Sequence, residues 1–108
     1  MQLMTTAIRR KLLANHKKQS LDTKPVVKYF NPYGGGTWLI SSMDKEGIMF
    51  GLCDLGFGLP ELGYVSLYEL QTAVTPMGVG IERDLYWDAD KSLKEYSDIA
   101  LECGYIKD

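Results

Sequence analysis

Two acidic residues on one predicted strand have the types and spacing best suited to acid–base chemistry. Glu82 and Asp84 are separated by one residue, so both side chains point to the same face of an extended segment. With Asp54 or Glu61 nearby, such a pair could share a proton or hold a divalent cation. The outer face of a strand is normally charged, however, and the single histidine, His16, lies in a basic segment. We therefore expect a solvated strand face here, with no catalytic residue and no metal site.

Arg83 lies between these two acids and has a different expected environment. Alternation along residues 81–87 places it on one face with Ile81, Leu85 and Trp87. A guanidinium among apolar side chains needs a carboxylate or an aromatic face to offset its desolvation. We expect a structural ion pair with Asp54, Glu61 or Glu69, and the alternative is an anchor for a binding partner.

The glycine-rich segments do not match a phosphate-binding loop. Residues 34–36 are followed by Thr37-Trp38, with no lysine and no helix whose first amides could bind phosphate. The chain also lacks the Gly-x-Ser-x-Gly pattern of a nucleophilic serine. Turn formation accounts for these glycines, and we expect no cofactor.

The charges are segregated along the chain. Seven basic residues and one acidic residue precede Tyr29, whereas five basic and thirteen acidic residues occupy the rest. The basic segment could bind nucleic-acid phosphates, dock on the acidic body, or form a solvated helix face. An acidic surface near the C-terminus would repel nucleic acid and attract a basic protein surface, or simply keep its helix solvated. The basic candidates are Arg9, Arg10, Lys11, Lys17 and Lys18, and the acidic candidates are Asp84, Asp88, Asp98 and Glu102.

Periodicity predicts an α+β fold. Helical spacing or capping residues predict helices at about residues 6–18, at 67–73 before Thr75-Pro76, and from Asp90 or Ser92 to Gly104. Strand patterns cover residues 26–30, 37–41, 48–53 and 81–87, with a short strand at 64–65. We expect one domain over residues 1–108, a twisted antiparallel sheet (a meander plus a later strand) packed with an N-terminal, a short middle and a C-terminal helix. We expect burial of Trp38, Ile40, Phe50, Leu85 and Trp87, and inward packing of Leu55, Phe57, Leu59 and Leu62.

The composition is that of an ordinary globular domain. The chain has 108 residues, of which 45% are hydrophobic and 24% charged. It has no apolar run long enough to cross a bilayer and no signal-peptide pattern at its start. The two cysteines are too few for a disulfide framework. These features predict a cytoplasmic protein with no membrane contact.

Five segments occur in an order that resembles a known bacterial family, the domain of unknown function 2958. They are PVVKYFNP at 25–32, TW at 37–38, FG at 50–51, ELGYVSLYEL at 61–70 and GIERDL at 80–85. The resemblance covers roughly residues 3–87, and the acidic helix after Asp88 extends past the expected family core. This chain has Ser41-Ser42 where relatives often have an acidic residue after the tryptophan strand.

The resemblance implies a small protein of plasmids, conjugative elements or phages, in a family with no agreed activity or catalytic residues. We expect a non-enzymatic protein that binds another protein, such as a host nuclease complex antagonised by an anti-CRISPR or antirestriction factor. The alternative is a nucleic-acid-binding accessory protein that uses the basic N-terminal helix. A small carboxylate-based or metal-dependent enzyme is the third hypothesis. The oligomeric state is left open.

Overall fold

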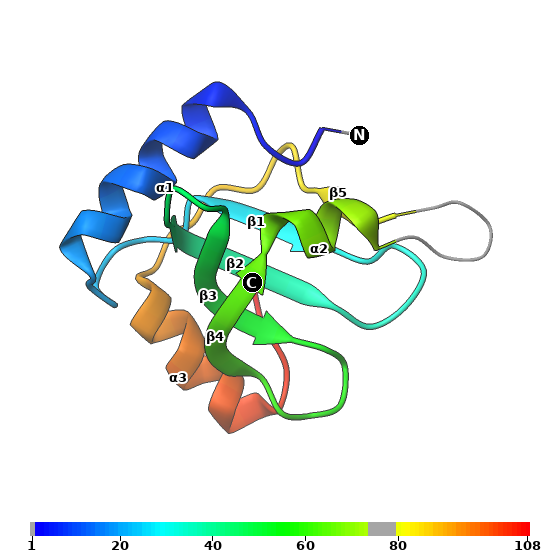
Figure 1. Ribbon diagram of the computed structural model, residues 1–108. Coiled ribbons are helices and arrows are strands. Elements are labelled where there is room, and N and C mark those ends of the chain that lie inside the picture. The colour runs from blue at the N-terminus through cyan, green and yellow to red at the C-terminus, as the bar shows by residue number, and fades with distance from the viewer. Residues whose placement is uncertain (1, 74–79) are drawn as a thin grey trace.

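A five-stranded antiparallel sheet forms the centre of the computed structural model, which describes residues 2–73 and 80–108 (Figure 1). The strand order is β4-β3-β2-β1-β5, and every neighbouring pair is antiparallel. The predicted α+β class and the meander followed by a later strand are confirmed. The elements are α1 (Thr6–Lys18), β1 (Val27–Phe30), β2 (Thr37–Met43), β3 (Ile48–Asp54), β4 (Glu61–Ser66), α2 (Leu67–Thr72), β5 (Glu82–Arg83) and α3 (Leu93–Cys103).

The sheet is covered on both faces, which makes a three-layer molecule (Figure 1). Tyr29 and Trp38 face a cluster formed with α1, α2 and the segment before α1. Leu39 and Leu52 face a second cluster formed with α3 and Ile106. Because both faces of the sheet are buried, the central strands carry apolar side chains on both of their faces rather than on one face only. Among the residues that the structure describes, no helix is long and apolar enough to span a membrane.

The helix boundaries follow local capping chemistry. The Thr5 hydroxyl accepts a hydrogen bond from the Ile8 amide at 3.1 Å and begins α1. Ser92, rather than Asp90, caps α3, and it forms a reciprocal capping box with Glu95. Gly104 ends α3 in the left-handed conformation, as predicted. α2 ends at Thr72, and the predicted Thr75-Pro76 stop lies outside the described residues.

A β-bulge interrupts the pairing of β2 with β3. Ile40 is paired with Gly51 and Ser42 with Phe50, so Ser41 is an additional residue on β2. Bulges bend the strand and leave the extra residue outside the regular ladder. The side chain of Asn15 in α1 donates to the released Ser41 carbonyl at 2.9 Å. The bulge therefore connects the sheet to the C-terminal end of α1.

The last predicted strand is much shorter than expected. Only Glu82 and Arg83 pair with β1, whereas the pattern predicted residues 81–87. The Asp84 carboxylate accepts the Tyr86 amide at 3.0 Å, and this Asx turn bends the chain away from the sheet. Leu85 is consequently 56% exposed, so its predicted burial is wrong. Trp38 and Ile40 are buried as predicted, while Phe50 and Trp87 are half-buried against the second cluster.

The loop between β3 and β4 is also different from the prediction. β4 is a full strand that pairs with β3 from Cys53↔Glu61 to Ile48↔Ser66, so residues 55–60 form a connection beyond the end of the sheet. Of these residues only Pro60, next to β4, is buried. The predicted inward packing of Leu55, Phe57 and Leu59 is therefore wrong, and all three are exposed. Leu62 does pack against the second cluster.

Candidate functional site

The acidic candidates do not form one uniformly charged surface. Asp84 lies 3.9 Å from Lys28, which also forms an ion pair with Asp108. Asp98 pairs with Lys94 at 2.7 Å, and this hydrogen bond raises the pKa of Lys94. Asp88 and Glu102 are exposed, and within the described residues neither forms a salt bridge. Of the four acidic candidates, Asp84 and Asp98 are therefore ion-paired, whereas Asp88 and Glu102 form no salt bridge within the described residues.

The basic candidates are all on the solvent side of α1. The salt bridges within residues 2–73 and 80–108 use Lys28, Lys91 and Lys94, and none involves a cation of α1. Their long side chains keep the charged groups in water. The basic helix thus does not dock on the described acidic body through ion pairs. The exposed cations of α1 are Arg9, Arg10, Lys11, Lys17 and Lys18.

The strand order separates Glu82 and Asp84 from Asp54 and Glu61, the carboxylates expected near them. Glu82 is on β5 and Asp54 on β3, with β1 and β2 between them. The buried Asp54 carboxylate instead accepts the amides of Gly56 at 2.9 Å and Ile106 at 3.0 Å. Asp54 therefore fixes the start of the β3–β4 loop and the C-terminal segment. No cluster of three or more His, Cys, Asp or Glu residues suited to a metal ion occurs in the part of the chain that the structure describes.

Arg83 lies on the face covered by α1 and α2. It is directly opposite Tyr29, and its Nε donates to the Gln2 carbonyl at 3.1 Å. Its predicted pairing with Asp54 or Glu61 is wrong, because these residues lie on strands that are third and fourth from β5. An arginine side chain cannot cross three strand spacings of about 4.8 Å each. An ion pair with Glu69 stays a prediction.

One end of the molecule carries a cluster of exposed apolar side chains, which we name the apolar end. It is built from the β1–β2 loop, the β3–β4 loop, the last turn of α3 and the segment directly after α3. These segments are adjacent, since a Cβ on Gly35 would lie 3.1 Å from Leu55 O, and a Cβ on Gly104 would lie 3.7 Å from Gly58 O. The apolar end consists of Tyr33, Leu55, Phe57, Leu59, Leu101 and Tyr105.

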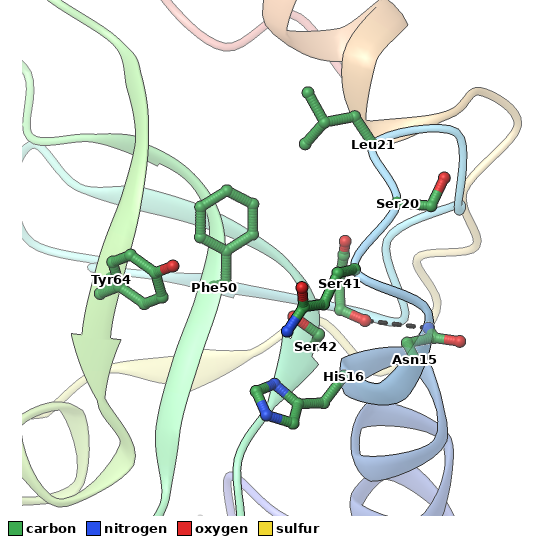
Figure 2. Close-up of a pocket in the computed structure, with 9 residues that line it drawn as sticks. Asn15, His16, Ser20, Leu21, Ser41, Ser42, Phe50 and Tyr64 are labelled. Carbon is green, nitrogen blue, oxygen red and sulfur yellow. Dashed lines mark hydrogen bonds between the residues drawn. The ribbon is translucent and has the colours of Figure 1, made fainter.

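A second surface feature is a pocket of about 240 Å³ beside the bulge, which we name the polar pocket (Figure 2). Its walls come from three regions of the chain. The end of α1 and the following turn provide polar groups, β2 provides two serines, and β3 and β4 provide an aromatic pair (Figure 2). The residues around it are Asn15, His16, Gln19, Ser20, Leu21, Ser41, Ser42, Phe50 and Tyr64.

One residue that lines the polar pocket, Ser41, has a buried hydroxyl group with unused hydrogen-bonding capacity. Ser41 is 2% exposed, and its Oγ has no hydrogen-bond partner. Such a group is uncommon, because a buried hydroxyl without a partner destabilises the fold. On another wall the rings of Phe50 and Tyr64 lie 5.0 Å apart and are inclined by 55°. The pocket therefore combines hydrogen-bonding groups with an aromatic surface.

The sequence patterns missed the polar pocket. Ser41-Ser42 attracted notice only as a departure from the family pattern, and the strand was expected to end at Ser41. Neither the two serines nor the periodicity of their strand reveals a bulge that places Ser41 beside α1. An available signal was Gly51 opposite the bulge, because a glycine inside a strand often marks such a site.

The fold and these surfaces define a three-layer α+β protein built on a five-stranded antiparallel sheet. A family model described as Protein of unknown function (DUF2958) matches residues 3–107, and the chain belongs to this family. The match confirms the resemblance and extends it through α3, so the expectation that the last helix lies past the family core is wrong. No curated protein and no solved structure significantly matches the chain.

Proposed function

We propose that this protein is a non-enzymatic, protein-binding factor of a mobile genetic element that works in the cytoplasm of its bacterial host through the apolar end. The observation that carries the proposal is the exposure of Phe57 and Leu59, at 81% and 78%. Two large apolar side chains at the tip of one loop, beside further apolar groups, are typical of a surface that a partner covers.

The base of the loop supports a binding role because it is fixed before any partner arrives. Asp54 accepts the Gly56 amide from the loop and the Ile106 amide from the C-terminal segment. A loop with an ordered base loses less conformational entropy on association. Full burial of a side chain such as Phe57 contributes about 1.5–3 kcal/mol, so two of them can act as the centre of an interface.

The charges around the apolar end indicate the kind of partner. Asp98 and Glu102 lie on the solvent side of α3, next to Leu101 of the apolar end. A basic partner surface with an apolar pocket would complement this arrangement. The nucleic-acid channel of a host nuclease complex would supply the basic surface. The mobile-element setting implied by the family resemblance supports an antagonist of host defence, of the anti-CRISPR or antirestriction type.

The test compares paired variants in capture from host lysate, followed by affinity measurement with the purified partner. Phe57→Ala combined with Leu59→Ala should abolish capture of a nuclease complex while the melting temperature stays unchanged. The matched control is Tyr68→Ala combined with Tyr86→Ala, which also removes two exposed large side chains but lies outside the apolar end. Equal capture by both double variants would overturn the proposal.

Charge reversal at Asp88, Asp98 and Glu102 tests the acidic contribution separately. The association rate with the captured partner should fall at low salt, because the long-range attraction is lost. The difference should shrink at high salt, where charges are screened. An unchanged association rate at low salt would remove the acidic side chains from the interface.

A second candidate function is nucleic-acid binding by α1, and the absence of described ion pairs at its five cations favours it. Phosphate contacts release counterions, so the logarithm of affinity should fall linearly with the logarithm of salt concentration. Replacing Arg9, Arg10 and Lys11 by Gln should flatten that slope. A DNA or RNA titration without binding at low salt would reject this function.

A further inference from the structure

We propose that the polar pocket binds the base of a nucleotide, with the phosphate directed toward the lysines of α1. The pocket is distinct from the apolar end. Phe50 lies near the start of β3, whereas the loop of the apolar end follows the last residue of that strand. The proposal goes beyond the protein-binding function, and its failure would leave that function standing.

The size of the pocket limits what it can hold. Its volume of about 240 Å³ is below the roughly 300–1,000 Å³ of sites for drug-sized ligands. A single planar heterocycle fits such a space, while an extended ligand would project into solvent. The phosphate and sugar of a nucleotide would therefore remain outside the pocket.

The hydrogen-bonding groups suit the edge of a base. The buried Ser41 Oγ has no partner in the described protein and can both donate and accept. Ser42 and the amide side chain of Gln19 also line the pocket. Figure 2 shows Ser41 and Ser42 between the aromatic pair and the end of α1. Mixed donors and acceptors match the edges of nucleobases, which present both kinds of group.

The aromatic pair provides a stacking surface. Tyr64 is 74% exposed and packs against the half-buried Phe50. Unstacked bases bind on aromatic side chains of this kind in proteins that recognise single strands. An exposed tyrosine beside a polar pocket gains apolar contact when a base covers it.

The charges near the pocket favour a phosphate-bearing ligand. Among the described residues that line it there is no Asp, Glu, Lys or Arg. Lys11 and Lys18 are four residues before and three residues after Asn15, which places both beside it on the helix surface. Neither lysine forms a salt bridge within the described residues. A base in the pocket could therefore direct its phosphate to these cations.

The walls of the pocket are held in place without a ligand. Asn15 donates to the Ser41 carbonyl at 2.9 Å and fixes α1 against the bulge. The Leu21 carbonyl accepts the Lys94 amide at 2.9 Å and fixes the turn after α1 against α3. A site formed in advance loses little entropy on binding.

The experiment titrates the full chain with nucleoside monophosphates, ribose 5-phosphate and inorganic phosphate, using calorimetry and amide chemical shifts. At least one nucleoside monophosphate should bind saturably and shift the amides of residues 41, 42 and 64. Ribose 5-phosphate should bind at least tenfold more weakly, because it lacks a base. Equal affinity for ribose 5-phosphate, or no saturable binding of any nucleotide, would overturn the proposal.

Two variants identify the pocket as the binding site. Ser41→Ala should leave the melting temperature unchanged or raise it, since it removes an unpartnered hydroxyl, and should weaken nucleotide binding about fivefold. Tyr64→Ala should weaken binding about tenfold through lost stacking. The control Tyr68→Ala removes a tyrosine that is 72% exposed outside the pocket and should leave affinity unchanged. Wild-type affinity in both pocket variants would refute the assignment.

Oligonucleotides then distinguish a free nucleotide from a base within a strand. If single-stranded oligonucleotides bind more tightly than monophosphates and lose that advantage in Tyr64→Ala, the base belongs to a strand. Equal affinity of monophosphate and oligonucleotide indicates a free nucleotide. A duplex that binds equally well in wild type and Tyr64→Ala would place duplex binding outside the pocket, so the two proposals can fail separately.

Discussion

Gly51 is the residue on which the bulged pairing of β2 and β3 depends most directly. It is paired with Ile40 immediately before the additional residue Ser41. A Cβ at position 51 would lie 2.0 Å from the Leu39 carbonyl oxygen and 2.8 Å from the Ile40 Cα. Both are main-chain atoms of the neighbouring strand, so no side-chain rotation can relieve the overlap. Gly51→Ala should therefore force the two strands apart.

The size of the effect follows from that separation. Ordinary contact begins at 3.4 Å, so the strands would have to move by about 1.4 Å. Overpacking of this kind destabilises by about 1–3 kcal/mol, and each ladder hydrogen bond lost adds about 0.5–1.5 kcal/mol. We expect a loss of about 3–5 kcal/mol, a large part of the stability of a small domain. The corresponding drop in melting temperature is roughly 12 °C or more.

The assay is urea unfolding followed by tryptophan fluorescence and circular dichroism, with Gly63→Ala as the matched control. Gly63 is paired with Gly51 on the adjacent strand, but a Cβ there meets no atom within 4 Å. Its replacement should be neutral or stabilise by about 0.4–1 kcal/mol, through the unfolded state. A Gly51→Ala protein within about 1 kcal/mol of wild type, with an unchanged m-value, would refute the close approach of the strands.

Three further perturbations address the core, alkaline stability and the C-terminal segment. Trp38→Ala should destabilise by about 3–5 kcal/mol in the same urea assay, because the buried indole leaves a cavity; a loss below 1 kcal/mol would contradict its place in the core. Burial raises the pKa of Tyr29 to about 12 from 10.0, so the unfolded phenol ionises first and stability should fall between pH 10 and 12 by about 2–3 kcal/mol. Tyr29→Phe should make stability less dependent on pH in this range, although the variant also loses the 2.7 Å hydrogen bond to the Leu3 carbonyl. An equally steep fall of stability with pH would contradict the assignment of this effect to Tyr29. Asp54→Ala removes the acceptor of the Ile106 amide and should speed hydrogen exchange in residues 104–108, while Asp54→Asn should retain partial protection. Unchanged exchange in both variants would contradict the anchoring role of Asp54.

Features set by neighbouring residues could be predicted from the sequence. α1 spans residues 6–18 as predicted, because Thr5 supplies the first acceptor and the apolar side chains recur at helical spacing. The same reasoning located Ser92 and Glu95, whose reciprocal bonds depend only on residues three apart. The strands of the meander were found for a similar reason, since short turns keep them adjacent.

Features set by the order of strands or by one polar side chain were not predictable in this way. The Asp84 carboxylate ends β5 by accepting a hydrogen bond from the Tyr86 amide. The alternation of apolar and polar residues continues beyond Asp84, so the sequence pattern predicted a longer strand. Pairing of β4 with β3 moved Phe57 outside the sheet, although an apolar loop read in isolation indicates burial. The polar pocket required both the bulge at Ser41 and the approach of α1, which no local pattern encodes.

Arg83 has two possible roles, a structural contact or an anchor for a binding partner, and a single variant can distinguish them. Its Nε donates to the Gln2 carbonyl, and its charge opposes the rise in the pKa of Tyr29. Arg83→Met keeps the apolar stem but removes the donor, so the segment before α1 should loosen and stability should fall by about 1 kcal/mol. We expect a lower melting temperature and faster exchange in residues 2–4, with partner binding preserved at temperatures where the variant is folded. An unchanged melting temperature together with lost partner binding would show instead that Arg83 contacts the partner.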